Sequence, residues 1–95
     1  MADTVVHDES GSRFVLMRGD QEIGETVYET REDGGIVFVH TGVDEALQER
    51  GLGSTLVKGA LDQLRSSTAV RIGATCPFVR AYLERHPEYN DLTNR

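Results

Sequence analysis

The chain has 95 residues, of which 16 are acidic and 10 are basic, so its formal net charge is −6. This length fits one domain, and we expect residues 1–95 to form a single one. The negative charge argues against nucleic acid or an anionic membrane as a partner. One cysteine allows neither an internal disulfide nor a thiolate metal cluster, so no metal is expected. With no secretory signal and no apolar run approaching the roughly 20 residues of a membrane span, we predict a cytoplasmic protein.

Residues 1–11 are expected to form a flexible tail. Three β-rich stretches follow, over 12–17, 21–30 and 36–39, and polar turns containing glycine separate them. The second stretch interleaves apolar with polar residues, as in a sheet with one solvated face, whereas the third is continuously apolar. Short turns between these stretches predict an antiparallel meander.

From Leu52 the apolar residues recur every three or four positions, which predicts an amphipathic helix that ends at 66–68. A fourth strand is expected over 70–74. Strand, helix and strand in this order predict a crossover that leaves the two strands parallel. A Cys-Pro pair then opens a second helix, expected over 77–85, because proline favours the first helical position. The predicted fold class is α+β.

Two glycines, Gly51 and Gly53, stand where the longest predicted helix begins. In a helix interior each would cost about 1 kcal/mol relative to alanine. A helix N-terminus offers unpaired N–H groups and the positive end of the dipole, so bare backbone there admits phosphate oxygens. Arg50 adds a cation to the same turn. The alternative is that the two glycines only relieve crowding between the helix and a strand.

This loop resembles motif A of the GNAT superfamily of CoA-dependent N-acyltransferases, whose pattern is Gln/Arg-x-x-Gly-x-Gly/Ala. Gln48, Gly51 and Gly53 match the pattern position by position. With the later stretch CPFVRAYLERHPEY, the chain is similar to the small, stand-alone YjdJ-type branch over most of its length, residues 14–91. The resemblance implies a minimal GNAT-like fold. It lacks the two helices that follow the first strand in larger members and help to build the acceptor pocket.

The resemblance implies an N-acetyltransferase that moves an acetyl group from acetyl-CoA to an unidentified amine. In the family, amides of the loop hold the CoA pyrophosphate, and the preceding strand pairs with the pantetheine arm. The residues expected to bind the cofactor are Thr41, Val43, Gln48, Glu49, Arg50, Gly51, Leu52, Gly53, Ser54 and Arg80. Arg80, on the second helix, is expected either to reach a phosphate or to be solvated.

Two side chains are candidates for catalysis. Cys76 precedes a proline and is expected to cap the second helix, where the positive end of the dipole activates a thiol. Alternatively, it is a small hydrophobe at the end of a buried strand. His40 ends the third predicted strand, and histidine titrates near neutral pH, which suits a general base. It could pair with Cys76, or serve only as a structural hydrogen-bonding group.

Leu83 stands where the family has the tyrosine that protonates the leaving thiolate. The usual acid is therefore absent, and Tyr82 is expected to pack in the core. This departure leaves open a second function, a CoA- or acyl-CoA-binding module with little turnover. We expect an acetyltransferase assisted by Cys76. Because a sheet of few strands has an edge available for pairing, a monomer or a weak homodimer is expected.

Overall fold

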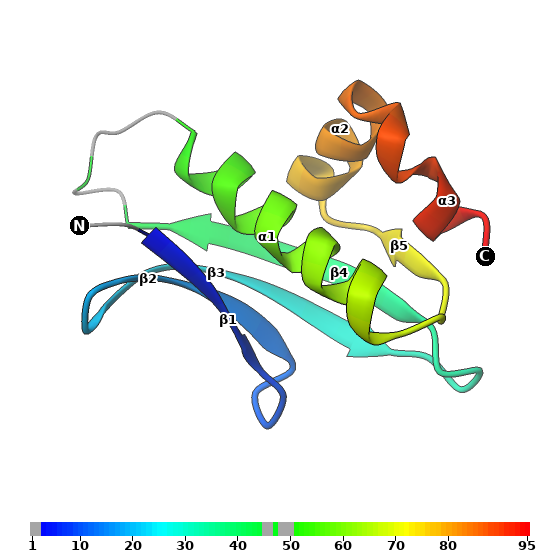
Figure 1. Cartoon of the computed structure of the whole chain (residues 1–95), viewed down its shortest axis with the longest axis horizontal. Helices are drawn as coiled ribbons and strands as arrows, with labels where there is room; N and C mark the ends of the chain where they lie inside the picture. The colour runs from blue at the N-terminus through cyan, green and yellow to red at the C-terminus, as the bar shows by residue number, and fades with distance from the viewer. Residues whose placement is uncertain (1–2, 45–46, 48–50) are drawn as a thin grey trace.

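The computed structural model describes residues 3–44, 47 and 51–95. They form a five-stranded sheet with helices packed against it (Figure 1). The strands are β1 (Asp3–Asp8), β2 (Arg13–Arg18), β3 (Gln21–Thr30), β4 (Ile36–Val43) and β5 (Ile72–Ala74). The helical elements are α1 (Leu52–Ser67), α2 (Pro77–Arg85), the 3-10 turn η1 (Pro87–Tyr89) and the single turn α3 (Asn90–Thr93).

The strands lie in chain order, β1-β2-β3-β4-β5. The first four are antiparallel, and β4 and β5 are parallel because α1 connects them. This confirms the predicted meander, the crossover and the α+β fold class. The predicted boundaries of both long helices are also close, because α1 ends at Ser67 and α2 spans Pro77–Arg85.

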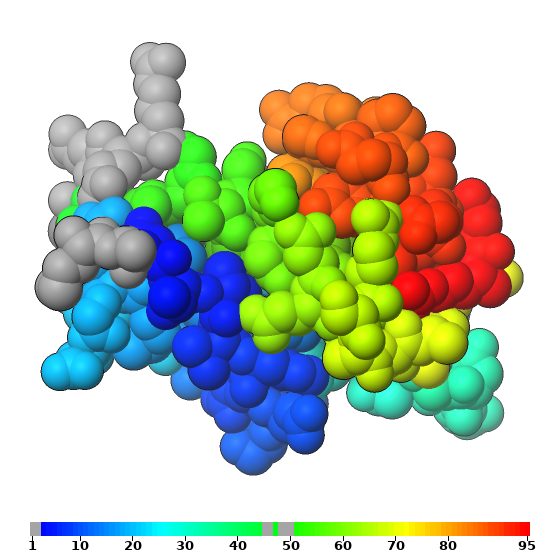
Figure 2. All heavy atoms as spheres, viewed as in Figure 1, coloured from blue at the N-terminus to red at the C-terminus, as the bar shows by residue number. Residues whose placement is uncertain are grey.

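The structure contradicts the expected flexible tail at residues 3–8, which form the edge strand β1. Val5 packs directly on α1: a Cβ at Gly59 would lie only 2.4 Å from its Cγ2. Gln63 of α1 donates a hydrogen bond from Nε2 to the carbonyl oxygen of Val5, at 2.7 Å. Figure 2 shows the dark blue atoms of β1 against the green atoms of α1. The strand is therefore held by α1 as well as by β2.

His7 fastens the same strand to the core. Its ring stacks on Phe14 with centroids 4.2 Å apart, and its Nε2 lies 2.7 Å from the hydroxyl of Tyr28. Tyr28 is buried beside Phe38, and burial raises the pKa of its phenol. His7 is therefore a structural residue of the sheet rather than part of a tail.

Strand β4 is longer than the predicted stretch over 36–39. It continues to Val43 because β3 pairs with it along this whole length, ending at the pair Gly24 and Val43. Sequence patterning missed this end because the stretch after Val39 is polar and contains a glycine, whereas the predicted strand was defined by apolar residues alone.

A β-bulge interrupts the pairing of β3 with β4. Val27 faces His40 while the next residue, Tyr28, faces Phe38, so Val39 is an extra residue in β4. A bulge changes which face later side chains point to. Beyond it, Thr41 pairs with the fully buried Thr26.

The predicted apolar stripe of α1 is confirmed, and it packs into one core with the sheet and the C-terminal helices. Its buried residues are Leu52, Leu56, Val57, Ala60, Leu61 and Leu64. Full burial of each leucine contributes about 1.5–3 kcal/mol. The C-terminal segment is tied to the exposed side of α1 by hydrogen bonds from Tyr89 Oη to Asp62 and from Arg65 to Asp91, each 2.7 Å long.

Candidate functional site

Strands β4 and β5 separate after a short parallel pairing. The last pair is Phe38 with Ala74, and the amides of Thr75 and Cys76 both donate to the carbonyl oxygen of Phe38, at 2.9 and 3.1 Å. Beyond Phe38, the described part of the chain places no strand along this side of β4. The end of β4 therefore has backbone groups that no neighbouring strand occupies.

A cavity of about 240 Å³ lies between this free end of β4 and the start of α1. It is lined by residues from β4, from the beginning of α1 and from α2. The lining residues are Thr41, Gly42, Val43, Gly51, Leu52, Gly53, Ser54 and Phe78. Six of these are among the residues predicted to bind the cofactor, so residues from two separate elements meet in one place.

The two glycines at the start of α1 have different surroundings. Gly51 adopts a left-handed conformation with φ of 82°, and a Cβ placed on it would meet nothing within 4 Å. The Thr55 N–H is bonded to the carbonyl of Gly51 at 2.9 Å. The amides that precede it have no intrahelical acceptor. Among the described residues, no side chain caps α1, and its first turn carries no acidic residue.

Gly53 has a neighbour that the sequence analysis missed. A Cβ on Gly53 would lie 2.6 Å from Cζ of Phe78, the second residue of α2. A larger residue at position 53 would therefore push the Phe78 ring aside, so the crowding at Gly53 comes from α2 and not from a strand. Phe78 follows the Cys-Pro helix start directly, but its orientation towards α1 depends on the packing of two helices.

Four of the residues predicted to bind the cofactor are not among the described residues that line the cavity. Gln48, Glu49 and Arg50 lie outside the described residues. Arg80 is exposed on α2, and it does not line the cavity.

Cys76 is the N-cap residue of α2, as predicted, and is 4% exposed. Its thiol donates a hydrogen bond to Thr41 Oγ1 at 3.5 Å, and Thr41 Oγ1 lies 2.9 Å from Thr26 Oγ1. Thr26 in turn donates to the carbonyl oxygen of His40 at 3.3 Å. Because a carbonyl oxygen can only accept, each group donates to the next: the Cys76 thiol to Thr41, Thr41 to Thr26, and Thr26 to the carbonyl of His40.

Of the two alternatives that the sequence left open for His40, the pair with Cys76 is not formed, since the thiol is bonded to Thr41. Neighbouring residues in a strand point to opposite faces, and the Thr41 side chain points to the buried face. The exposed His40 lies on the other face, where a Cβ on Gly42 would lie 3.4 Å from its Nε2. The buried threonine, not the histidine, is the partner of the thiol. The sequence did not reveal that Thr41 lies near Cys76, because the bulge at Val39 shifts the alternation of side chains between the two faces of β4.

The structure confirms that Tyr82 is a core residue. It is 3% exposed, and its ring stacks on His86 with centroids 4.1 Å apart. Burial raises the pKa of its phenol. Leu83 packs against the same core.

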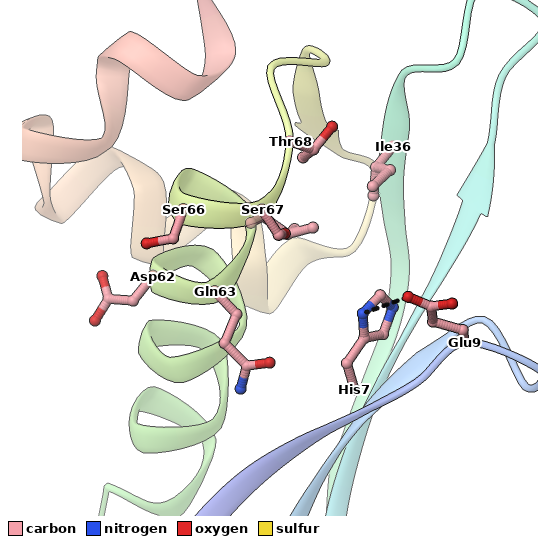
Figure 3. A pocket seen from close by; sticks show the side chains of 9 residues that line it. His7, Glu9, Ile36, Asp62, Gln63, Ser66, Ser67 and Thr68 are labelled. Carbon is pink, nitrogen blue, oxygen red and sulfur yellow. Dashed lines mark ion pairs between the residues drawn. The ribbon is translucent and has the colours of Figure 1, made fainter.

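A second hollow, about 570 Å³, lies between β1 and the C-terminal half of α1 (Figure 3). His7 and Glu9 face it from the sheet side. Asp62 points away from His7 in this view and is hydrogen-bonded to Tyr89. Since His7 is already engaged by the core, this hollow follows from the docking of β1 and is not the candidate site.

Comparison with known proteins decides the family. A family model described as GCN5-related N-acetyl-transferase matches residues 13–92, most of the chain. The chain belongs to the GCN5-related N-acetyltransferases. This confirms the predicted GNAT membership, with the GNAT-like fold and the acetyltransferase class that follow from it. A search of curated proteins finds no match.

Solved structures agree with this GNAT assignment. An NMR structure of a GCN5-like protein from Staphylococcus aureus, named as an N-acetyltransferase, has a TM-score of 0.68 and 26% identity, covering 93% of this chain and 84% of that one. Ribosomal-protein-alanine N-acetyltransferase from Brucella melitensis biovar Abortus 2308 shares the fold, with a TM-score of 0.54, 12% identity, and coverage of 80% and 60%. Arabidopsis thaliana Naa50 bound to a bisubstrate analogue, with a TM-score of 0.47, 19% identity and coverage of 70% and 52%, is too distant to bear on function.

No helix in the described part of this GNAT protein is both long and apolar enough to cross a membrane.

Proposed function

We propose that this GNAT protein transfers an acetyl group from acetyl-CoA to an amine. The observation that supports this most directly is the cavity where the free end of β4 meets the open start of α1. Two expectations carry over from the sequence as part of the proposal, the YjdJ-type branch and a cytoplasmic location. The competing function, a CoA-binding module without turnover, is not favoured because the chain belongs to a family of enzymes.

The residues present fit a diphosphate. Gly51 leaves space where any other residue would place a Cβ, and the amides at the start of α1 point towards the N-terminal end of the helix. Among the described residues, the first turn of α1 carries no acidic side chain that would repel the anion. In our proposal Gly51, Leu52, Gly53 and Ser54 hold the phosphates. Bound acetyl-CoA supplies a thioester, and the end of β4 is the natural place for backbone donors to polarise its carbonyl.

An amine acceptor must lose its proton before it can attack, because an alkyl amine is mostly protonated at neutral pH. We assign this proton to His40. It is exposed on the open face of the sheet, so an acceptor can reach its ring from solvent. Thr41, the next residue, lines the cofactor cavity from the other face.

Cys76 is the second residue that we assign to the chemistry. Its thiol belongs to the loop where β5 ends and α2 begins, and it is bonded to a residue that lines the cavity. Leu83 provides no acid, so in our proposal the thiol bonded to Thr41 gives its proton to the CoA thiolate as it leaves. Whether the acetyl group passes directly to the amine or first to the thiol is decided by mass spectrometry after incubation with acetyl-CoA, where an adduct confined to Cys76 marks the covalent route.

Calorimetric titration with acetyl-CoA and CoA, followed by a screen of amine acceptors, tests the proposal. We expect binding to both ligands and acceptor-dependent release of CoA. Gly51→Val should abolish binding while leaving the sheet folded, since space around Gly51 is open and only the local backbone is strained. Affinity that survives this substitution would show that the phosphates do not lie at the start of α1.

A further inference from the structure

A cavity of about 210 Å³ lies where the turn between β3 and β4 meets β5. Two arginines, Arg31 and Arg71, line it together with Asp33, and we call it the Arg31–Arg71 cavity. Its other lining residues are Gly35, Ile36, Val37 and Gly73. None of these residues lines the candidate cofactor cavity, so the two cavities are separate.

Two residues of the Arg31–Arg71 cavity, Val37 and Gly73, lie on the same face of the sheet as His40. Residues that pair across neighbouring strands share a face. Val27 pairs with His40, and Glu29 pairs with Val37. Because Val27 and Glu29 are two positions apart in β3, they point to the same face. Val37 therefore lies on the face of His40, and so does Gly73, its partner in β5.

The arginines can bind a ligand. Among the described residues, the Arg31 side chain has no hydrogen-bond or ion-pair partner. Arg71 donates one hydrogen bond, from Nε to the backbone oxygen of Arg95 at 3.1 Å, and its terminal nitrogens have no partner in the described part of the chain. Asp33 is engaged by the turn, since its Oδ1 accepts the N–H of Gly35 at 2.8 Å. Two positive charges and one negative charge line the cavity, which favours a ligand group with a single negative charge.

Gly73 keeps the Arg31–Arg71 cavity open. A Cβ on Gly73 would meet nothing within 4 Å, so any larger side chain would extend into the cavity. The backbone itself does not require glycine here, because Gly73 is not among the glycines with a positive φ. Its partner Val37 supplies an apolar surface beside this space.

We infer that the Arg31–Arg71 cavity binds a carboxylate of the acceptor, while the amine of the acceptor lies at His40. Guanidinium groups bind carboxylates through parallel pairs of N–H groups, which gives arginine its preference for them. The acceptor is therefore an amine that carries a carboxylate at its other end. This inference rests on the proposed function, in which His40 takes the proton of the amine.

The strand geometry sets the length of this acceptor. The step from Val27 to Glu29, and so from the position of His40 to that of Val37, is about 7 Å. Arg31 is two positions further along the chain, which adds at most about 7 Å. The carboxylate would thus lie about 7–14 Å from the amine, the length of two to four extended residues. A short peptide with free termini satisfies this distance.

NMR titration of the isotope-labelled protein with triglycine and with triglycinamide tests the inference. The two peptides differ only in the replacement of the carboxylate by an uncharged amide. Triglycine should shift the backbone amides of Val37, Gly73 and His40, and it should bind about tenfold more tightly than triglycinamide. Arg31→Gln should remove this difference. Arg85→Gln, a matched change of an exposed arginine at the end of α2 and outside the cavity, should retain it.

Gly73→Val fills the Arg31–Arg71 cavity without changing a charge. Valine favours strands, and the space around Gly73 is open. The variant should therefore fold with unchanged or higher stability and lose triglycine binding, which separates a loss of binding from a loss of folding.

Equal affinities for the two peptides in the wild-type protein, or no binding of either, would refute the inference. Triglycine binding that survives both Arg31→Gln and Gly73→Val would refute it as well. Calorimetric titration with acetyl-CoA reports separately on the proposed function. If the protein binds acetyl-CoA but does not prefer triglycine, the inference fails and the proposed function stands. If it prefers triglycine but does not bind acetyl-CoA, the proposed function fails, and with it the assignment of the carboxylate to an acceptor.

Discussion

Gly59→Ala distinguishes a docked β1 from a flexible tail by the sign of its effect on stability. In an isolated helix this change gains about 1 kcal/mol, because alanine is the better helix former. In the structure the new Cβ would lie 2.4 Å from Cγ2 and 2.8 Å from Cβ of Val5, where ordinary contacts begin at 3.4 Å. Val5 is β-branched and fixed in a strand, so neither atom can rotate away freely.

The expected outcome is a net loss of stability. Inserting a methyl group into a well-packed contact costs about 1–3 kcal/mol. Subtracting the gain in helix propensity leaves a loss of about 1 kcal/mol, which is a measurable share of the roughly 5–15 kcal/mol that stabilises a typical domain. Urea unfolding followed by circular dichroism measures it, with the slope of the transition as a check that both states are unchanged.

The double variant Val5→Ala/Gly59→Ala is the control. It removes both Cγ atoms and leaves only the contact of 2.8 Å between the two Cβ atoms, so Gly59→Ala should cost less in the Val5→Ala background than in the wild-type protein. If Gly59→Ala stabilises the protein by about 1 kcal/mol, the packing of β1 on α1 is refuted.

Four further outcomes are expected. Hydrogen bonds, above all the one from Arg13, lower the pKa of Asp8 in the folded protein, so the unfolded state binds more protons as the pH falls. Urea unfolding should therefore show constant stability above about pH 5 and a decline below about pH 4. Stability that rises on acidification would contradict this. Gly51→Ala should cost about 1–2 kcal/mol, since φ is 82° there, and calorimetry should show weaker CoA binding. Cys76→Ala should leave CoA binding unchanged and slow acetyl transfer; unchanged turnover would reduce the thiol to a packing residue. Thr41→Val should cost about 1 kcal/mol in unfolding free energy by removing the hydroxyl between the thiol and the sheet, while Thr41→Ser should recover it.

The parts of the fold that the sequence predicted are those whose signals are local. The apolar stripe from Leu52 and the Cys-Pro start of α2 each depend on residues within a few turns of one another. The left-handed conformation of Gly51 was not predicted, although a glycine just before a helix allows it at little cost.

The parts that the sequence missed depend on contacts between distant segments. β1 has no strong pattern of its own, and what holds it is the small Gly59 and the amide of Gln63 on a helix far along the chain. The motif linked Gly53 to a phosphate by its position. Its contact with Phe78, however, depends on the angle at which α1 and α2 pack. No periodicity in one segment carries that information.

The bulge at Val39 has the largest consequence for the proposed chemistry. Without it, the alternation along β4 from the buried Phe38 would turn His40 towards the helices and Thr41 away from them. With the extra residue, Thr41 turns towards Cys76 and His40 towards solvent. In the proposed reaction the thiol and the base therefore act from opposite faces of the same strand. The acceptor then approaches from the face on which His40 is exposed, while the coenzyme enters between β4 and α1. Chemical modification of His40 tests this arrangement. When the protein is saturated with CoA, diethyl pyrocarbonate should still modify His40. Protection of His40 by CoA alone would place both substrates on one face and refute the two-sided arrangement.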